Sequence, residues 1–138
     1  MPMGLTIQIR GDILAAMRDE SAKNPEQECC GVLAGRDGII SVIFSARNAH
    51  PESAKAYEIA PEELCRMMRE MRARDLQMLG IYHSHPRGEN RPSPRDIESV
   101  FYSDAAYFIV SPLADAPQSV RAFSIRDGHV AELRIETV

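Results

Sequence analysis

Hydrophobic residues recur along the chain with two different spacings, which predicts both strands and helices. Leu5, Ile7 and Ile9 alternate with polar residues, and this period of two predicts a short strand. Apolar residues at positions 13, 14, 16 and 17 then follow a helical spacing. We expect this helix to begin with Asp12 as its N-cap and to end near Asn24–Pro25.

The middle of the chain predicts a hairpin, a helix and another strand. CCGVLAG (29–35) has the composition of a buried strand, and Asp37–Gly38 marks a tight turn before IISVIFSA (39–46). A loop follows, with a short extended piece at 57–59. After Pro61 the apolar residues form one helical face, which we expect to pack in the core: Leu64, Met67, Met68 and Met71. LQMLGIYHSH (76–85) is the next predicted strand.

The last third of the chain predicts one helix and three strands. Ser93, Pro94 and Asp96 suit the N-cap, first and third positions of a helix, which we expect to continue to about Tyr102. Strands are predicted at 105–112, 120–128 and 129–136, the last two joined by a turn at Asp127–Gly128. Helices and strands are interspersed, so we expect an α/β or α+β sandwich around a mixed β-sheet. The length of 138 residues predicts one domain, spanning 1–138.

Charge and cysteine content narrow the class of protein. The formal net charge of −4 argues against a general binder of nucleic acid or anionic membrane. No apolar run is long enough for a spanning helix or has the form of a signal peptide, so we expect a cytoplasmic protein. Cys29, Cys30 and Cys65 lack the spacing of a disulfide framework or zinc ribbon. We interpret them as reduced thiols that pack as small buried hydrophobes.

The segment HSHPRGENRPSPRD (83–96) contains the residues best suited to metal binding and catalysis. His83 and His85 are two residues apart on a predicted strand, so their side chains point to the same face. The loop that follows is rich in turn formers and long enough to bring Asp96 back to them. Two imidazoles and one carboxylate suit a catalytic zinc ion, because three protein ligands leave a fourth position open. A histidine pair taken alone is more often structural or solvent-exposed.

Hydrolysis at such a site also needs a group that accepts a proton from water. Glu89 lies in the middle of the loop. We interpret Glu89, Arg87 and Arg91 as solvated loop residues, although either arginine could contact an acidic surface of the substrate. Glu28 directly precedes the predicted strand at 29–35, where it would be held more firmly. It is therefore the better candidate for the base.

These residues resemble the motif of the JAMM (MPN-plus) metalloproteases. The shared pattern is H-S-H-P, six residues, then S-x-x-D, with a glutamate before a Cys-Gly upstream, and YEIAPEEL and YFIVSP also look like bacterial members. The resemblance implies an α/β sandwich with a curved sheet. It implies one zinc ion held by His83, His85 and Asp96, Glu28 as the general base, and Ser93 as a donor to the oxyanion. Ser93 also suits a helix N-cap, and both roles stay open, with the donor role favoured.

The resemblance also implies a substrate. The family cleaves peptide or isopeptide bonds after the C-terminal glycines of ubiquitin-like proteins, and small bacterial members are associated with sulfur carriers of that fold. We therefore expect a zinc peptidase or isopeptidase that trims a sulfur carrier or releases cysteine from it. The alternatives are a non-catalytic interaction scaffold and a structural zinc site, with Glu28 or a cysteine as fourth ligand. A homodimer through an exposed strand edge is possible, and no ubiquitin-clamping insertion is evident between Asp96 and Ala105.

Overall fold

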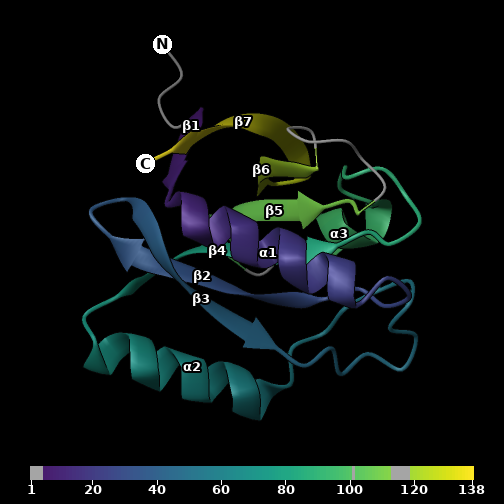
Figure 1. Cartoon of the computed structure of the whole chain (residues 1–138), viewed down its shortest axis with the longest axis horizontal. Coiled ribbons are helices and arrows are strands. Elements are labelled where there is room, and N and C mark those ends of the chain that lie inside the picture. The colour runs from purple at the N-terminus through teal and green to yellow at the C-terminus, as the bar shows by residue number, and fades with distance from the viewer. Residues whose placement is uncertain (1–4, 101, 113–118) are drawn as a thin grey trace.

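A computed structural model of the chain describes residues 5–100, 102–112 and 119–138 (Figure 1). The described residues form strands β1–β7 and helices α1–α3. In chain order these are β1 Thr6–Ile9, α1 Gly11–Lys23, β2 Cys30–Arg36, β3 Ile39–Ala46, α2 Pro61–Ala73, β4 Gln77–Ser84, α3 Pro94–Glu98, β5 Ala106–Val110, β6 Val120–Arg126 and β7 His129–Thr137.

The strands form one mixed sheet that closes on itself. Its order is β1-β3-β2-β4-β5-β6-β7, and β1 pairs in parallel with both β3 and β7. The β4–β5 pair is also parallel, whereas the remaining pairs are antiparallel. The expected curved mixed sheet with flanking helices is thus confirmed. Because every described strand has a neighbour on each side, the exposed strand edge that was considered for a possible homodimer is not found among them.

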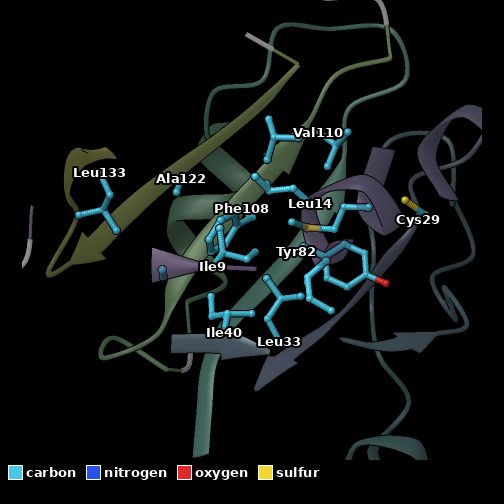
Figure 2. Close-up of a cluster of buried hydrophobic side chains, with 14 residues drawn as sticks. Ile9, Leu14, Cys29, Leu33, Ile40, Tyr82, Phe108, Val110, Ala122 and Leu133 are labelled. Atoms are coloured by element: carbon cyan, nitrogen blue, oxygen red, sulfur yellow. The ribbon is translucent and has the colours of Figure 1, made fainter. Parts of the chain in front are cut away.

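The concave side of the sheet packs against α1. Ile13, Leu14 and Met17 of this helix join a buried cluster with side chains from β1 to β7. Figure 2 shows Ile9, Leu33 and Phe108, among others, gathered in this cluster. Burying each such side chain contributes roughly 1.5–3 kcal/mol to folding. This cluster holds β2, β4 and β5 together beneath the ends that carry the candidate site.

The opposite side of the sheet is covered by α2 and α3. Met67 and Met71 of α2 pack against Val32 and Ala34 of β2, which confirms that the methionine face belongs to the core. Ile97 of α3 packs beside residues of β4, β5 and β6 in a third cluster. Side chains alternate along β4, so Ile81 and His83 lie on this side, whereas Tyr82 lies in the α1 cluster. The chemistry-bearing residues therefore lie on the side covered by α2 and α3.

Two expected helix boundaries are wrong. Asp12 is not the N-cap of α1: the N-cap is Arg10, in an extended conformation, and Asp12 lies in the first turn, where its carboxylate pairs with Arg10 at 2.6 Å. Helix α3 ends at Glu98 instead of continuing to Tyr102. The Tyr102 carbonyl accepts the N–H of Ala105 and the hydroxyl of Tyr107, so it is taken up by the turn into β5.

The segment 49–60 forms neither a helix nor a strand. The extended piece expected at 57–59 forms no strand, although the N–H of Ala49 donates to the carbonyl of Glu58 at 2.8 Å.

All three cysteines are free, and burial raises the pKa of the Cys29 thiol to about 11 and that of Cys30 to about 12. Cys65 is exposed, so the expectation that it is buried is wrong. No helix among the described residues is long and apolar enough to cross a membrane.

Candidate active site

His83, His85 and Asp96 bring three metal-ligating atoms together at one end of the sheet. His83 belongs to the end of β4, His85 follows it two residues later on the same side, and Asp96 is in the first turn of α3. The Nε2 atoms of the two histidines are 3.0 Å apart, and they lie 3.2 Å and 3.1 Å from Oδ2 of Asp96. The three residues that were expected to be ligands from the sequence therefore converge on one point.

The dimensions of this cluster suit a zinc ion. Zinc binds imidazole nitrogen and carboxylate oxygen at roughly 2.0–2.2 Å, so two ligand atoms of a tetrahedral site are about 3.3 Å apart. The observed separations of 3.0–3.2 Å are close to that value. The side chain of His83 is 1 % exposed and those of His85 and Asp96 are 11 % and 12 % exposed. The cluster could hold a metal ion, and its three ligands would leave a further position open.

Neighbouring groups fix the two imidazole rings. Nδ1 of His85 lies 2.7 Å from the carbonyl oxygen of Glu89, which makes Nδ1 the protonated nitrogen and leaves the Nε2 lone pair for a metal ion. The ring of His83 stacks on Tyr57, with the ring centroids 4.4 Å apart. Nδ1 of His83 is buried and has no hydrogen-bond partner among the described residues. The loop that was interpreted as solvated thus orients the His85 ring through its backbone.

Asp96 is held by the capping box of α3. The backbone N–H of Ser93 donates to Asp96 Oδ2 at 2.8 Å, and the backbone N–H of Asp96 donates to Ser93 Oγ at 3.1 Å. Ser93 is therefore the N-cap of α3. Its hydroxyl acts as an acceptor in this bond, so its own proton is still available to a second group. The helix start aims the carboxylate at the two histidines.

Glu28 lies directly before Cys29 and β2, the strand that pairs with β4. Cys30 stands opposite His83 in the antiparallel register, and the N–H of Ser84 donates to the carbonyl of Cys29 at 3.0 Å. The hydroxyl of Ser84 accepts the N–H of Cys29 at 2.9 Å. Continued by one residue, this register places Glu28 opposite His85. Its side chain is buried, and Oε1 has no hydrogen-bond partner among the described residues.

Burial and charge set the protonation of these groups. Burial raises the pKa of Glu28 to about 7, with His85 opposing and Asp96 adding to the effect. Burial also lowers the pKa of His83, which keeps its ring neutral and able to bind metal. Burial favours a higher pKa for Asp96, but the bonds with His83 and His85 outweigh it and hold that pKa well below its usual range. The site therefore combines an ionised carboxylate with a second carboxyl that exchanges protons near neutral pH.

The pKa of Glu28 predicts a pH-dependent effect on stability in metal-free protein. The folded-state pKa of about 7 exceeds the ordinary value of 4.5, so the folded state holds the proton more tightly than the unfolded state between these pH values. The free energy of unfolding should consequently fall as pH rises from 4.5 to 7. Glu28→Gln removes this loss, and its Tm should exceed that of the wild type by a few degrees at pH 8.

The comparison is made by thermal unfolding of metal-free wild type and variant at pH 4.5 and pH 8. The Tm advantage of Glu28→Gln should shrink towards the lower pH. Glu26→Gln is the matched control, because Glu26 is exposed two residues earlier in the chain. A Tm difference that is equal at both pH values would show that the Glu28 carboxyl is not held in its protonated form by burial.

A family model described as "Prokaryotic homologs of the JAB domain" matches residues 11–126, which is most of the chain and includes all the site residues named above. The chain belongs to this family. The match confirms the resemblance to the JAMM family that the motif indicated.

Three relatives with assigned activities cover most of the chain. A desampylase of Haloferax volcanii is 32% identical over 80% of this chain and 81% of its own. A probable TtuB-protein conjugate cleaving protease of Thermus thermophilus is 32% identical, covering 94% of this chain and 83% of its own. A CysO-cysteine peptidase of Mycobacterium bovis is 31% identical, covering 94% of this chain and 90% of its own. Family and relatives together show that the protein is a hydrolase.

Solved structures agree on the fold. A solution structure of a Desulfitobacterium hafniense protein matches 96% of this chain and 93% of its own, with a TM-score of 0.85 and 26% identity. A structure described as "JAMM: A Metalloprotease-like Zinc Site in the Proteasome and Signalosome" covers 95% of this chain and 98% of its own, with a TM-score of 0.62. At 18% identity this second likeness shows the fold alone. The JAMM/MPN-type sandwich expected from the sequence is confirmed.

The structure adds site features that the sequence did not indicate. The carbonyl of Glu89 orients His85, Tyr57 stacks on His83, and Arg95 lies 3.4 Å from Nε2 of the half-buried His50. A backbone carbonyl leaves no trace in a residue pattern. Tyr57 lies in a loop without periodicity, so no sequence signal identifies its contact with His83.

Proposed function

We propose that this protein is a zinc-dependent peptidase or isopeptidase. It cleaves the bond after the C-terminal Gly-Gly of a ubiquitin-like sulfur-carrier protein, trimming its tail or releasing cysteine. One observation carries this proposal: two histidine nitrogens and one carboxylate oxygen meet within 3.2 Å, and the buried carboxyl of Glu28 interacts electrostatically with His85 and Asp96. The ligands of the single zinc ion are His83, His85 and Asp96.

Glu28 has the properties of the general base in this reaction. Zinc bound by the three ligands supplies a Lewis acid that polarises the scissile carbonyl and lowers the pKa of water. Glu28 takes a proton from the attacking water and passes it to the leaving amine. In the metal-free protein burial raises the pKa of Glu28 to about 7, which shows that this carboxyl can hold a proton as well as release one. No described hydrogen bond occupies Oε1, which leaves it available for the proton.

Ser93 is proposed to donate its hydroxyl proton to the oxyanion of the tetrahedral intermediate. The hydroxyl oxygen accepts the Asp96 N–H at 3.1 Å, so capping the helix and donating to a substrate oxygen are compatible. The capping bond also holds the hydroxyl beside Asp96, within the first turn of α3. A donor held in place before the reaction stabilises developing charge without reorganisation.

The two roles of Ser93 can be separated by two substitutions. Ser93→Ala removes the cap and the donor, at a cost of about 1 kcal/mol in stability, whereas Ser93→Gly keeps most of the capping preference. If the hydroxyl donates to the oxyanion, both variants should lose about 10²–10³-fold in kcat. If Ser93 only caps the helix, Ser93→Gly should retain most of the activity. The measurements are kcat and Tm for each variant at saturating zinc.

An apolar groove beside the cluster supports a protein tail as the substrate. The groove has a volume of about 1020 Å³, at the upper end of the roughly 300–1,000 Å³ typical of ligand pockets. Val32 and Ile81 from adjacent strands and Leu64 from α2 line it, and Asp96 lies in its wall. A groove that ends at a metal ligand suits an extended segment whose last glycines lie over the cluster.

The names of the relatives support the same substrate class. One name describes cleavage of TtuB-protein conjugates, one describes a peptidase of CysO-cysteine, and one is a desampylase. We infer that the substrate of this protein is likewise a ubiquitin-like carrier. The cytoplasmic location expected from the sequence fits three free cysteines and is kept as part of this proposal. A homodimer stays a prediction.

The test is to incubate zinc-loaded protein with ubiquitin-like sulfur carriers that bear C-terminal extensions. Intact mass should show one product that ends at Gly-Gly. The same carriers with Gly-Gly replaced by Ala-Ala are the matched controls and should stay intact. If protein that holds zinc cleaves none of the extended carriers, the proposed substrate is wrong and a non-catalytic scaffold gains support.

A further inference from the structure

A second hollow lies next to the metal cluster: Glu89 lines it, and the carbonyl of Glu89 accepts a hydrogen bond from His85 Nδ1 at 2.7 Å. It has a volume of about 600 Å³, and the loop after β4 forms one wall, while Ser111, directly after β5, and Arg121 of β6 line another part. Its lining shares no residue with the apolar groove, which includes Asp96. Short contacts connect the two linings through the cluster, from Glu89 to His85 at 2.7 Å and from His85 to Asp96 at 3.1 Å.

This hollow is rich in arginine. Arg87, Arg91 and Arg121 line it together with Glu89. Arg91 pairs with Glu89 at 3.3 Å, and Arg121 pairs with Glu132. Arg87 has no ion pair among the described residues. The hollow thus has an excess positive charge, although the whole chain has a net charge of −4.

Arg121 is held ready to bind a planar anion. Its side chain is 18% exposed, its guanidinium lies 5.4 Å from the ring centre of Phe123, and two of its N–H groups donate to Glu132. A guanidinium has five N–H donors, so further donors are not used by the Glu132 pair. Because the group is already fixed, little rotamer entropy is lost when a carboxylate binds.

The arginine loop is anchored to the catalytic cluster itself. The carbonyl of Glu89 accepts a hydrogen bond from Nδ1 of His85 at 2.7 Å, and the carbonyl of Gly88 accepts one from Ser111 Oγ at 3.1 Å. These two contacts fix the loop at Gly88 and Glu89. A group bound between the arginines is consequently held at a set position relative to His85.

We propose that this hollow is a subsite for a carboxylate on the part of the substrate that follows the scissile bond. The inference rests on the proposed function, in which the apolar groove beside Asp96 takes the tail before that bond. The leaving part then extends past His85 into the hollow. The carboxylate is either the terminal carboxylate of a single released residue or an acidic side chain near the cleavage point, since the arginines recognise the same group in both.

The experiment compares three carriers whose tails end in Gly-Gly followed by alanine with a free carboxylate, alanine amide, or aspartate amide. The wild type should cleave one or both carboxylate-bearing carriers about tenfold more efficiently than the alanine amide, mainly through KM. The carrier that is preferred identifies the source of the carboxylate. The double variant Arg87→Gln/Arg91→Gln should lose this preference, while its kcat for the carrier that ends in alanine amide should stay unchanged.

The matched control is Arg69→Gln/Arg72→Gln, which removes the same charge from exposed positions of α2 and should keep the preference. An equal preference in wild type and the Arg87/Arg91 variant would overturn the inference while leaving the proposed function intact.

A binding measurement separates failure of the inference from failure of the proposed function. Acetyl-alanine should shift the Nε–Hε NMR signals of Arg87 and Arg121, and acetyl-alanine amide should not. This measurement needs no turnover. Shifts without cleavage of any carrier would support the carboxylate site and contradict the proposed substrate. The absence of shifts, with carriers cleaved at equal rates, would contradict the carboxylate site alone.

Discussion

Glu28→Gln is expected to keep the metal ion and lose nearly all hydrolysis. Glutamine preserves the size of the side chain but cannot accept a proton, so the rate should fall by about 10²–10⁴-fold, the usual contribution of a general base. The three proposed ligands, His83, His85 and Asp96, are unchanged, so zinc content should equal that of the wild type. Unfolding does not explain such a loss, because the same change should stabilise the metal-free protein above pH 7.

The measurement combines kcat on an extended carrier with metal analysis of the same sample. Glu26→Gln, an exposed glutamate in the same loop, is the control and should keep full activity. Unimpaired turnover by Glu28→Gln at saturating zinc would refute the assigned base. Loss of zinc from the variant would instead point to Glu28 as a fourth ligand, which is the arrangement of a structural site.

Asp96→Asn is expected to lose the metal ion itself, and activity with it. An amide oxygen is a much weaker zinc ligand than a carboxylate, so affinity should fall by more than the 10–100-fold that an outer contact costs. The local fold should survive, because an asparagine oxygen can still accept the Ser93 N–H that now bonds Oδ2 at 2.8 Å. Zinc content after dialysis should fall from about one equivalent to nearly none.

Asp19→Asn provides the same chemical change at an exposed position of α1 and should leave zinc content unchanged. His83→Ala should also lose the metal, but it removes a buried ring that stacks on Tyr57, so its effect on folding must be measured beside it. A wild-type zinc content in Asp96→Asn would show that the carboxylate is not a ligand. The His83–His85–Asp96 site would then have to be abandoned.

Local patterns were sufficient for most elements of the fold. The period of two placed His83 and His85 on one side of β4, and the Ser-Pro-x-Asp spacing identified the capping box of α3. Both depend on residues close in sequence, whose relative positions follow from backbone geometry. Where local signals failed, a contact from elsewhere decided the outcome. Helix α3 ends at Glu98, and the Tyr102 N–H that a longer helix would use donates instead to the Tyr107 hydroxyl of β5 at 3.4 Å. Arg10 rather than Asp12 is the N-cap of α1.

The role expected of Glu28 came from its place before a predicted buried strand and from a family resemblance, and no periodicity relates it to the histidines. Its approach to His85 depends on the register between β2 and β4, in which Cys30 stands opposite His83. A shift of one residue would turn Glu28 to the other side of the sheet. Such a register is decided by the packing of the whole core, because the local sequence of either strand allows several pairings.

The sequence by itself determined the strands, the helices and the residue types that can bind zinc and move a proton. Only the tertiary structure decided that β1 closes the sheet, that the Glu89 carbonyl orients His85, and that an apolar groove and an arginine hollow lie next to one cluster. The physical reason is the range of the interactions. Periodicity and capping act within a few residues, whereas closure, backbone contacts and hollows arise between segments that become neighbours only after folding.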